Sequence, residues 1–306
     1  MTAVMALGMV SAVSVQAGIE DKTLIVGFDA EYPPYGYMDE NGEYTGFDLE
    51  LAQAVCDLEG WELEKKPINW DSKDMELNSG SIDCIWNGFT MNGREDDYTF
   101  SEPYVDNSQV IVVADDSGIE KLTDLAGKTV GVQAASAALD LLQSEEEGGQ
   151  KELADTFGAL NEFADYNTAF TELQAGALDA LAIDVGVAKY QLNSRGEGFK
   201  ILDETLNTEQ YAIGFKKGNT ELCDIVNADL QKLADDGTVA ELAEKYRIRR
   251  YGNTRKLLMM HRQRIPKMQQ MMQKQNKQER KIRQYIKYEY RSGSAVSRFS
   301  GWHSLL

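Results

Sequence analysis

The segment KTVGVQAASAALDLLQ, residues 128–143, places a short apolar strand directly before a turn and an amphipathic helix. Further short apolar runs at 23–28, 83–88, 110–114, 178–184 and 211–215 predict more strands. Helical patterns alternate with these strands between Thr23 and Ile248. This alternation is typical of an α/β fold built from strand-helix units.

Two of the expected helices can be placed by their apolar spacing. In FDLELAQAVCDL, residues 47–58, the residues Phe47, Leu51, Val55 and Leu58 recur at helical intervals. In NADLQKLADDGTVAELAEKY, residues 227–246, the apolar spacing is less regular. We expect both segments to be helices that cover a sheet.

Length and charge divide the chain into unlike parts. Its 306 residues suit two domains, and 42% hydrophobic with 26% charged residues is typical of a globular protein. No apolar run reaches the ~18 residues of a membrane helix. Residues 1–248 hold 16 Lys and Arg against 48 Asp and Glu, whereas 249–306 hold 15 against 2. Because the acidic part repels phosphate backbones, we do not expect nucleic acid as its ligand.

The two ends of the chain carry separate expectations. Residues 1–17 are interpreted as a signal peptide with small residues at Val15 and Ala17, although no basic residue precedes the apolar run; a buried N-terminal helix is the alternative. No Cys lies near that cleavage site, which favours a free periplasmic or extracellular protein over a lipid-anchored one. The basic tail 248–306 is expected to lie outside the fold as a fused or frameshifted end; attachment to a membrane surface or nucleic acid is the alternative.

The three cysteines, Cys56, Cys84 and Cys223, are widely spaced and fit neither a metal cluster nor a disulfide framework. Each lies in an apolar pattern, which favours buried free thiols, and one disulfide stays possible in an oxidising compartment.

Eight motifs in constant order resemble the bacterial extracellular solute-binding proteins of family 3, which deliver polar amino acids to ABC importers. They are GFDAEYPPYGY (27–37), TGFDLELAQAV (45–55), LNSGSIDCIWNGFTMNGRE (77–95), TFSEPY (99–104), LAGKTVGVQAAS (125–136), LQAGALDALAID (173–184), EQYAIGFKKG (209–218) and LADDGTVAELAEKY (233–246). Each motif is weak alone, and the eight in register make the resemblance specific.

The resemblance implies a periplasmic-binding-protein-like fold of type II, with two α/β lobes joined by two hinge strands and the ligand cleft between them. Mapped onto this chain, lobe 1 covers 20–112 plus 209–247 and lobe 2 covers 113–208. It also implies a free amino acid as ligand, an ABC transporter permease as partner, a monomer, and neither cofactor nor metal.

A free amino acid is a zwitterion, so its site must offer a cation to the carboxylate and an anion to the ammonium. Arg94 can supply a planar fork for the carboxylate, and Thr90 can add a hydroxyl beside the main chain of Asn87 and Gly88. From lobe 2, Ser136 and the amides that follow it open a helix, where anions are favoured. Two lobes that hold one carboxylate would favour closure.

The remaining site residues follow from the resemblance. Asp184, at the end of a strand, resembles the ammonium-binding acid of the family; a solvated or capping Asp is the alternative. Tyr32 and Trp70 match the aromatic residues that enclose the ligand side chain, and core packing is the alternative for each. Asp29 is a candidate for contact with the far end of that side chain, or else a surface acid.

The chain departs from the family pattern at two places. The segment 90–94 is one residue shorter than usual, and Ala135 stands where Gly is common. A dehydratase-like enzyme on the same fold is the first alternative function, but neither lobe contains His, and both His261 and His303 lie in the tail. The second alternative is a sensory domain. We expect a binding protein without covalent chemistry.

Overall fold

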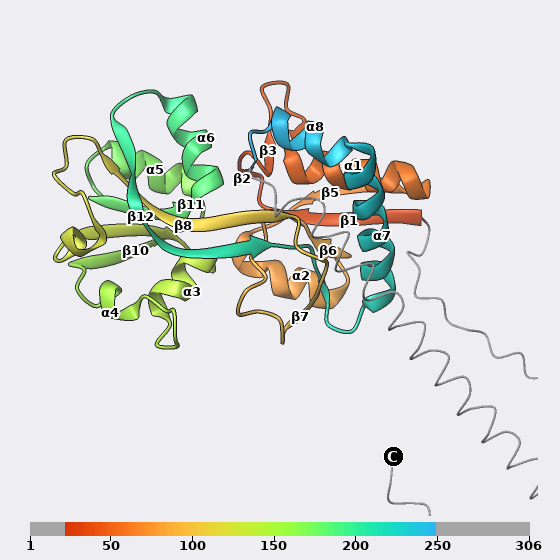
Figure 1. Ribbon diagram of the computed structural model, residues 1–306, viewed down its shortest axis with the longest axis horizontal. Coiled ribbons are helices and arrows are strands. Elements are labelled where there is room, and N and C mark those ends of the chain that lie inside the picture. Colours follow the sequence, from red (N-terminus) through yellow and green to blue (C-terminus); the bar gives the residue numbers. More distant parts are fainter. Residues whose placement is uncertain (1–21, 249–306) are drawn as a thin grey trace, which may run out of the picture. The chain divides into compact units, whose positions relative to one another are not determined.

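The computed structural model describes residues 22–248. The expected signal peptide and all but the first residue of the expected tail lie outside these residues. Mixed sheets with helices on their faces make up the described part (Figure 1). The α/β class predicted from the sequence is therefore confirmed.

The first lobe is built on a five-stranded sheet of order β5-β1-β6-β13-β7. β1 pairs in parallel with β5 and β6, whereas β13 pairs antiparallel to β6 and β7. Its strands are β1 (Thr23–Phe28), β5 (Glu62–Pro67), β6 (Cys84–Ile85), β7 (Tyr98–Phe100) and β13 (Gly214–Lys216). Its helices are α1 (Phe47–Glu59), α2 (Lys73–Ser79), α7 (Thr220–Asp236) and α8 (Thr238–Lys245), with the short 3₁₀ turn η2 (Trp70–Ser72).

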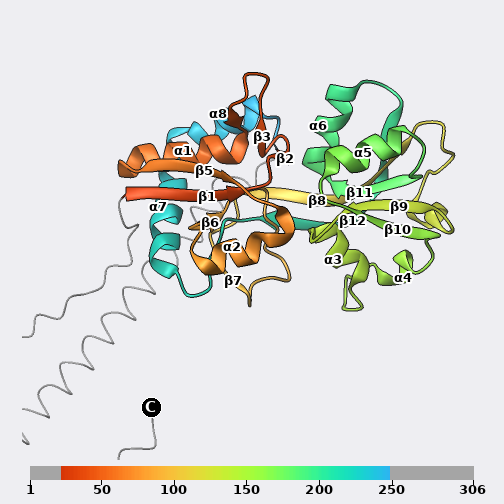
Figure 2. The same ribbon diagram turned by 180° about the vertical axis from the view of Figure 1, so that it is seen from behind.

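The second lobe is built on a five-stranded sheet of order β10-β9-β11-β8-β12. Its strands are β8 (Val105–Ala114), β9 (Thr129–Gln133), β10 (Ala159–Phe163), β11 (Ala180–Asp184) and β12 (Phe199–Tyr211). Its helices are α3 (Ala137–Gln143), α4 (Lys151–Ala154), α5 (Tyr166–Gln174) and α6 (Val185–Arg195), with the 3₁₀ turn η3 (Leu122–Leu125). Figure 2 shows α5 and α6 on one side of this sheet and α3 and α4 on the other.

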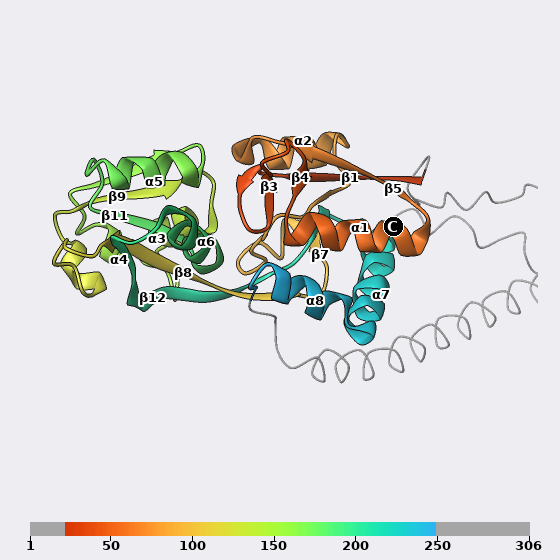
Figure 3. The same cartoon turned by 90° about the horizontal axis from the view of Figure 1, so that it is seen from above.

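Two long strands connect the lobes. β8 and β12 pair antiparallel from Val105 with Tyr211 to Ala114 with Phe199, with register irregularities between Ile201 and Asn207. Figures 1 and 3 show both strands reaching from the second lobe to the first. We call them the hinge strands. The predicted lobe boundaries at 112 and 208 fall inside these strands and stay a prediction as residue limits.

Several predicted elements are corrected by the structure. The strand expected at 83–88 is only the two residues of β6, and the one expected at 211–215 is the end of β12 followed by β13. The helix expected at 227–246 begins earlier and is broken at Gly237, whose φ of 99° ends α7 in a left-handed turn. Leu58, expected to face the core, is 45% exposed, because α1 ends at the next residue. A small hairpin sheet, β2 (Glu31–Tyr32), β3 (Gly36–Met38) and β4 (Tyr44–Thr45), was not predicted.

The cysteines are all buried and free, with no disulfide among them. Cys56 and Cys84 belong to the core of the first lobe, and Cys223 lies on α7. Within residues 22–248, none of the helices has the length and apolar character needed to cross a membrane.

Candidate functional site

One small pocket between the lobes collects seven of the nine predicted site residues. Its lining consists of Tyr32, Trp70, Gly88, Thr90, Arg94, Ser136 and Asp184, together with Gln133 and Ala137, which the sequence analysis did not include. The open space is about 10 Å³, which is the room of one water molecule. The lobes are therefore closed on each other and must separate to admit a larger molecule.

Arg94 lies in the loop between β6 and β7 and reaches across to the second lobe. Its Nη2 donates to Asp140 Oδ2 on α3 at 2.6 Å, and its Nη1 donates to the Thr90 carbonyl at 3.3 Å. The guanidinium also stacks 5.1 Å from the centre of the Phe89 ring. The shortened 90–94 segment thus does not prevent Arg94 from lining the pocket. Asp140, which is largely exposed, occupies one face of the guanidinium.

Lys73 is a second cation beside this pocket, and the sequence analysis missed it. The residue is 5% exposed, and its Nζ donates to the Ala135 carbonyl of the other lobe at 3.3 Å. The same Nζ lies 5.1 Å from the centre of the Trp70 ring. Burial and the nearby Arg94 lower the pKa of Lys73. Its place at the start of α2, where the helix dipole disfavours a cation, was the available sequence signal.

Asp184 is buried at the point where β11 ends and α6 begins. It occupies the N-cap position of α6 but makes no capping bond. Its Oδ1 instead accepts from Asn107 Nδ2 at 2.7 Å, Gln109 Nε2 at 2.7 Å and the Tyr211 hydroxyl at 2.5 Å. Neither the solvated nor the capping alternative therefore describes this carboxylate. It is a buried acid, hydrogen-bonded to the hinge strands, that faces the pocket.

The loop around Gly88 is held by an acid from α1. The Gly88 amide donates to Asp48 Oδ2 at 2.5 Å, and Asp48 is fully buried. Burial raises the pKa of Asp48 to about 7. At Gly88, whose φ is +57°, an added Cβ would meet the rings of Tyr211 and Tyr32 at 2.9 and 3.0 Å. The Gly88 amide therefore cannot also donate to a ligand, because it already donates to Asp48.

Thr90 and Asn87 differ in detail from the expectation. The Thr90 hydroxyl donates to Glu209 Oε1 on β12 at 2.8 Å, so it faces the hinge strands. The Asn87 side chain is buried outside the pocket lining and lies next to Gly36, and its Oδ1 has no partner among the described residues. The neighbouring residue Gly88 lines the pocket, whereas Asn87 does not.

The aromatic residues Tyr32 and Trp70 line the pocket together with Ser136. Tyr32 is buried in a cluster with Tyr35 and Tyr166, at ring distances of 5.7 and 6.0 Å, and its ring also lines the pocket. Trp70 is partly exposed and packs edge-on against Phe89. Each residue thus packs against other aromatic rings and also lines the pocket, and its role in enclosing a ligand side chain stays a prediction.

The turn before Ser136 is strained. Ser136 caps α3, with Oγ accepting from the Leu139 amide at 3.2 Å. The preceding residue, Ala135, has a φ of 54°, in the left-handed region that favours glycine. This is the physical consequence of the Ala that stands where the family commonly has Gly.

A second, larger chamber adjoins the pocket at Trp70. Its volume is about 540 Å³, and residues of both lobes line it. The acidic side chains of its lining are Asp29, Glu31, Asp71, Glu76 and Asp165, and no described Lys or Arg belongs to it. Within residues 22–248, Glu76 is the one of these acids with an ion-pair partner, Lys66 at 3.2 Å. The chamber is therefore strongly acidic.

Asp29 lies where the pocket and the chamber meet. Its Oδ2 accepts from Gln133 Nε2, across the lobes, at 2.7 Å, and its Oδ1 accepts from the Glu31 amide at 2.8 Å. Asp29 lines the chamber and not the pocket, and it is buried, so it is not a surface acid; its contact with the far end of a ligand side chain stays a prediction. Burial raises the pKa of its carboxyl to about 6, since no cation compensates the charge.

Comparison with known proteins fits this geometry. The model of the bacterial extracellular solute-binding proteins, family 3, matches residues 24–248. The chain belongs to this family.

Relatives in the family are named as amino-acid-binding proteins. The L-cystine-binding protein TcyJ of Escherichia coli is 29% identical over 255 residues, which cover 79% of this chain and 92% of TcyJ. The arginine-binding extracellular protein ArtP of Bacillus subtilis is 34% identical over 229 residues, covering 74% and 86% of the two chains. An ABC uptake transporter substrate-binding protein from Streptococcus pneumoniae, solved with bound histidine, is 34% identical with a TM-score of 0.69. The match covers 74% of this chain and 92% of that protein. The predicted family and type II fold are confirmed.

Proposed function

We propose that this family 3 protein binds a free amino acid with a cationic side chain and delivers it, outside the cytoplasm, to an ABC importer permease. The observation that carries the choice of side chain is the acidic chamber beside the zwitterion-sized pocket. Of the relatives described above, one is named for arginine and one was solved with histidine, while TcyJ is named for cystine.

In this proposal each end of the ligand has a partner. Arg94, supported by Lys73, binds the carboxylate in place of Asp140. Asp184 binds the ammonium. The side chain passes between Tyr32 and Trp70 toward Asp29. A cationic side-chain end there supplies the positive partner that the buried Asp29 carboxylate lacks.

The proposal includes no covalent step, because the binding of the ligand charges accounts for Arg94, Asp184 and Asp29 without a general acid. It also includes the export signal at 1–17 and a monomeric state, which rest on the sequence pattern and the family resemblance.

The test is calorimetric titration of the full chain with arginine and with citrulline, which has nearly the same shape but no side-chain charge. We expect arginine to bind at least ~30-fold more tightly, since citrulline leaves the acidic chamber without a cation. Lysine against norleucine repeats the comparison with an ammonium. Equal affinities within each pair would overturn the cationic choice.

Further ligands separate the alternatives. Glutamine, histidine and cystine test the other side-chain classes, and cyclic acids test the dehydratase-like alternative. If no amino acid binds and a cyclic acid does, the binding-protein assignment of the site is wrong.

A pH series adds an independent check. The pKa of Asp29 is raised to about 6 without ligand, and a bound cation must lower it. Arginine affinity should therefore rise between pH 5 and pH 7 as the proton is lost, and Asp29→Asn should reduce this rise. A steeper rise in the Asp29→Asn variant would contradict the role of Asp29.

A further inference from the structure

A second buried carboxylate lies directly behind the ammonium-binding candidate. Glu209, on β12, is 3% exposed, and its Oε1 accepts from Thr90 Oγ1 at 2.8 Å. Asn107 Nδ2 and Gln109 Nε2 donate to this same oxygen at 2.7 and 2.8 Å. Both amides also donate to Asp184 Oδ1, each at 2.7 Å. Two carboxylates thus share the same pair of amide donors.

The pair has no cation of its own within the described residues. Its charged and titratable neighbours are Tyr211 on β12, Tyr32 on β2, Tyr35, Tyr166 on α5, Arg94 in the lining of the small pocket, which pairs with Asp140, and, around an adjoining cavity, Asp106, Lys189 on α6 and Arg247 after α8. Lys189 and Arg247 are exposed, and no described ion pair joins either of them to Glu209. Two full negative charges buried this close together are unfavourable without a cation.

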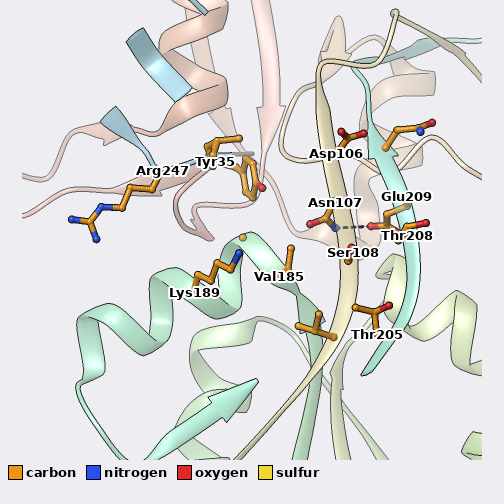
Figure 4. A pocket seen from close by; sticks show the side chains of 14 residues that line it. Tyr35, Asp106, Asn107, Ser108, Val185, Lys189, Thr205, Thr208, Glu209 and Arg247 are labelled. Carbon is orange, nitrogen blue, oxygen red and sulfur yellow. Dashed lines mark hydrogen bonds between the residues drawn. The ribbon is translucent and has the colours of Figure 1, made fainter. Parts of the chain in front are cut away.

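The two oxygens of Glu209 differ in their surroundings. Oε1 receives three short hydrogen bonds, whereas Oε2 receives only a long contact of 3.4 Å from Asn207 Nδ2. Glu209 also lines a cavity of about 350 Å³ beside the hinge strands (Figure 4). Figure 4 shows Asn107 with its amide nitrogen directed at Glu209. Oε2 is therefore the oxygen with room for a proton.

We propose that Glu209 is a positioning residue of the ammonium site and carries a proton that ligand binding releases. This proposal rests on the proposed amino-acid binding at Asp184. Without ligand, the pair holds one negative charge on Asp184 and one proton on Glu209 Oε2. When the ligand ammonium pairs with Asp184, Glu209 gives its proton to water and both carboxylates are ionised. The ammonium keeps its own protons throughout.

The direction of the pKa shift of Glu209 agrees with a proton on this residue when no ligand is bound. Burial, and then the charge of Asp184, raise the pKa of Glu209. A bound ammonium lowers the pKa of a neighbouring acid. Because the amides of Asn107 and Gln109 donate to both carboxylates, the ligand charge at Asp184 lowers the pKa of Glu209 without a direct contact between ligand and Glu209. The Thr90 bond also fixes the first-lobe loop to β12, so the same carboxylate positions the pocket wall.

The first experiment measures proton release. Two full-chain variants are titrated with arginine. The first is Asp29→Asn, which removes the other acid near the ligand side chain, and the second combines Asp29→Asn with Glu209→Gln. Each titration is run at equal pH in two buffers of different ionisation enthalpy between pH 5 and pH 8. We expect the first variant to release a substantial fraction of one proton near the pH at which Glu209 is protonated, and the double variant to release at least threefold less. Equal release by both variants would overturn the proposal.

Affinity gives a readout that a purely structural role would not move. Gln mimics the protonated Glu, so the two variants should bind arginine with similar affinity at pH 5.5. At pH 8 the Glu209 form should bind at least ~5-fold more tightly, because only it gains the second negative charge. A ratio that is the same at both pH values would count against proton linkage.

The second experiment needs no substitution at position 209. Infrared difference spectra of the unaltered chain, with ¹³C-labelled glutamate carboxyls, separate Glu from Asp29 and Asp48. Glu209 is the glutamate with a raised pKa among the described residues. Arginine binding at pH 6 should remove a labelled carboxylic-acid band; an unchanged band would overturn the proposal. Failure of the unaltered chain to bind any amino acid would instead defeat the proposed function itself.

Discussion

Replacing Asp184 by Asn is the most discriminating change in the proposed site. The carboxylate is 3% exposed and accepts three hydrogen bonds through Oδ1. An Asn oxygen can take the same three bonds, so the local geometry survives while the charge is lost. The ligand ammonium would then be buried without its anion.

The size of the effect follows from burial. Breaking a buried ion pair by removing one partner costs about 3–5 kcal/mol. A residual hydrogen bond to the Asn oxygen favours the lower end, which corresponds to at least ~100-fold weaker binding. Stability without ligand should move the other way, by up to ~1 kcal/mol, because a buried charge with no cation partner among the described residues has been removed.

Calorimetry and thermal unfolding test these two expectations together. Asp203→Asn is the control, since Asp203 is a strand acid too, on β12 rather than β11, but is exposed. A Kd for arginine within threefold of the unaltered chain, in an Asp184→Asn protein that unfolds cooperatively, would refute the assignment of Asp184 to the ammonium.

Three further changes test other parts of the structure. Asp48→Asn should weaken the pH dependence of stability, because the folded pKa of Asp48 is about 7 against an ordinary 3.8. Stability present at pH 4 is lost as pH rises to 7, by on the order of 3 kcal/mol, and urea unfolding across that range measures the loss. Ala135→Gly should relieve the left-handed φ of 54° and raise the unfolding free energy by ~0.5–1 kcal/mol, or the melting temperature by ~1–3 °C. Asp140→Asn frees Arg94, whose partner is largely exposed, and should tighten arginine binding ~2- to 5-fold; weaker binding would mean that Asp140 orients Arg94.

The sequence predicted those parts of the site that lie inside contiguous motifs. Thr90 and Arg94 share one loop, and Asp184 ends a strand whose apolar pattern is unbroken, so each could be placed by its immediate neighbours. The helix break at Gly237 was not predicted, although Gly is a common residue at a helix end.

Long-range neighbours could not be predicted in this way. Lys73 lies beside the pocket through its bond to the Ala135 carbonyl, which comes from the other lobe. Glu209 is connected to Asn107 through strand pairing, 102 positions away in the chain. The apolar run at 211–215 gave no sign of its division, because Tyr211 pairs with β8 while Gly214 pairs with β6 and β7.

The contacts between the lobes indicate which ligand group matters most. Arg94 is met by Asp140, and Asp29 is met by Gln133, so protein groups of the second lobe already occupy the places proposed for the ligand carboxylate and side chain. The Asp184 and Glu209 carboxylates have amide and hydroxyl donors but no described cation. A ligand carboxylate therefore replaces an existing partner, whereas the ammonium adds a charge that nothing else supplies. Binding energy should accordingly be concentrated at the hinge strands, where ionisation of the carboxylate pair and closure of the lobes are coupled.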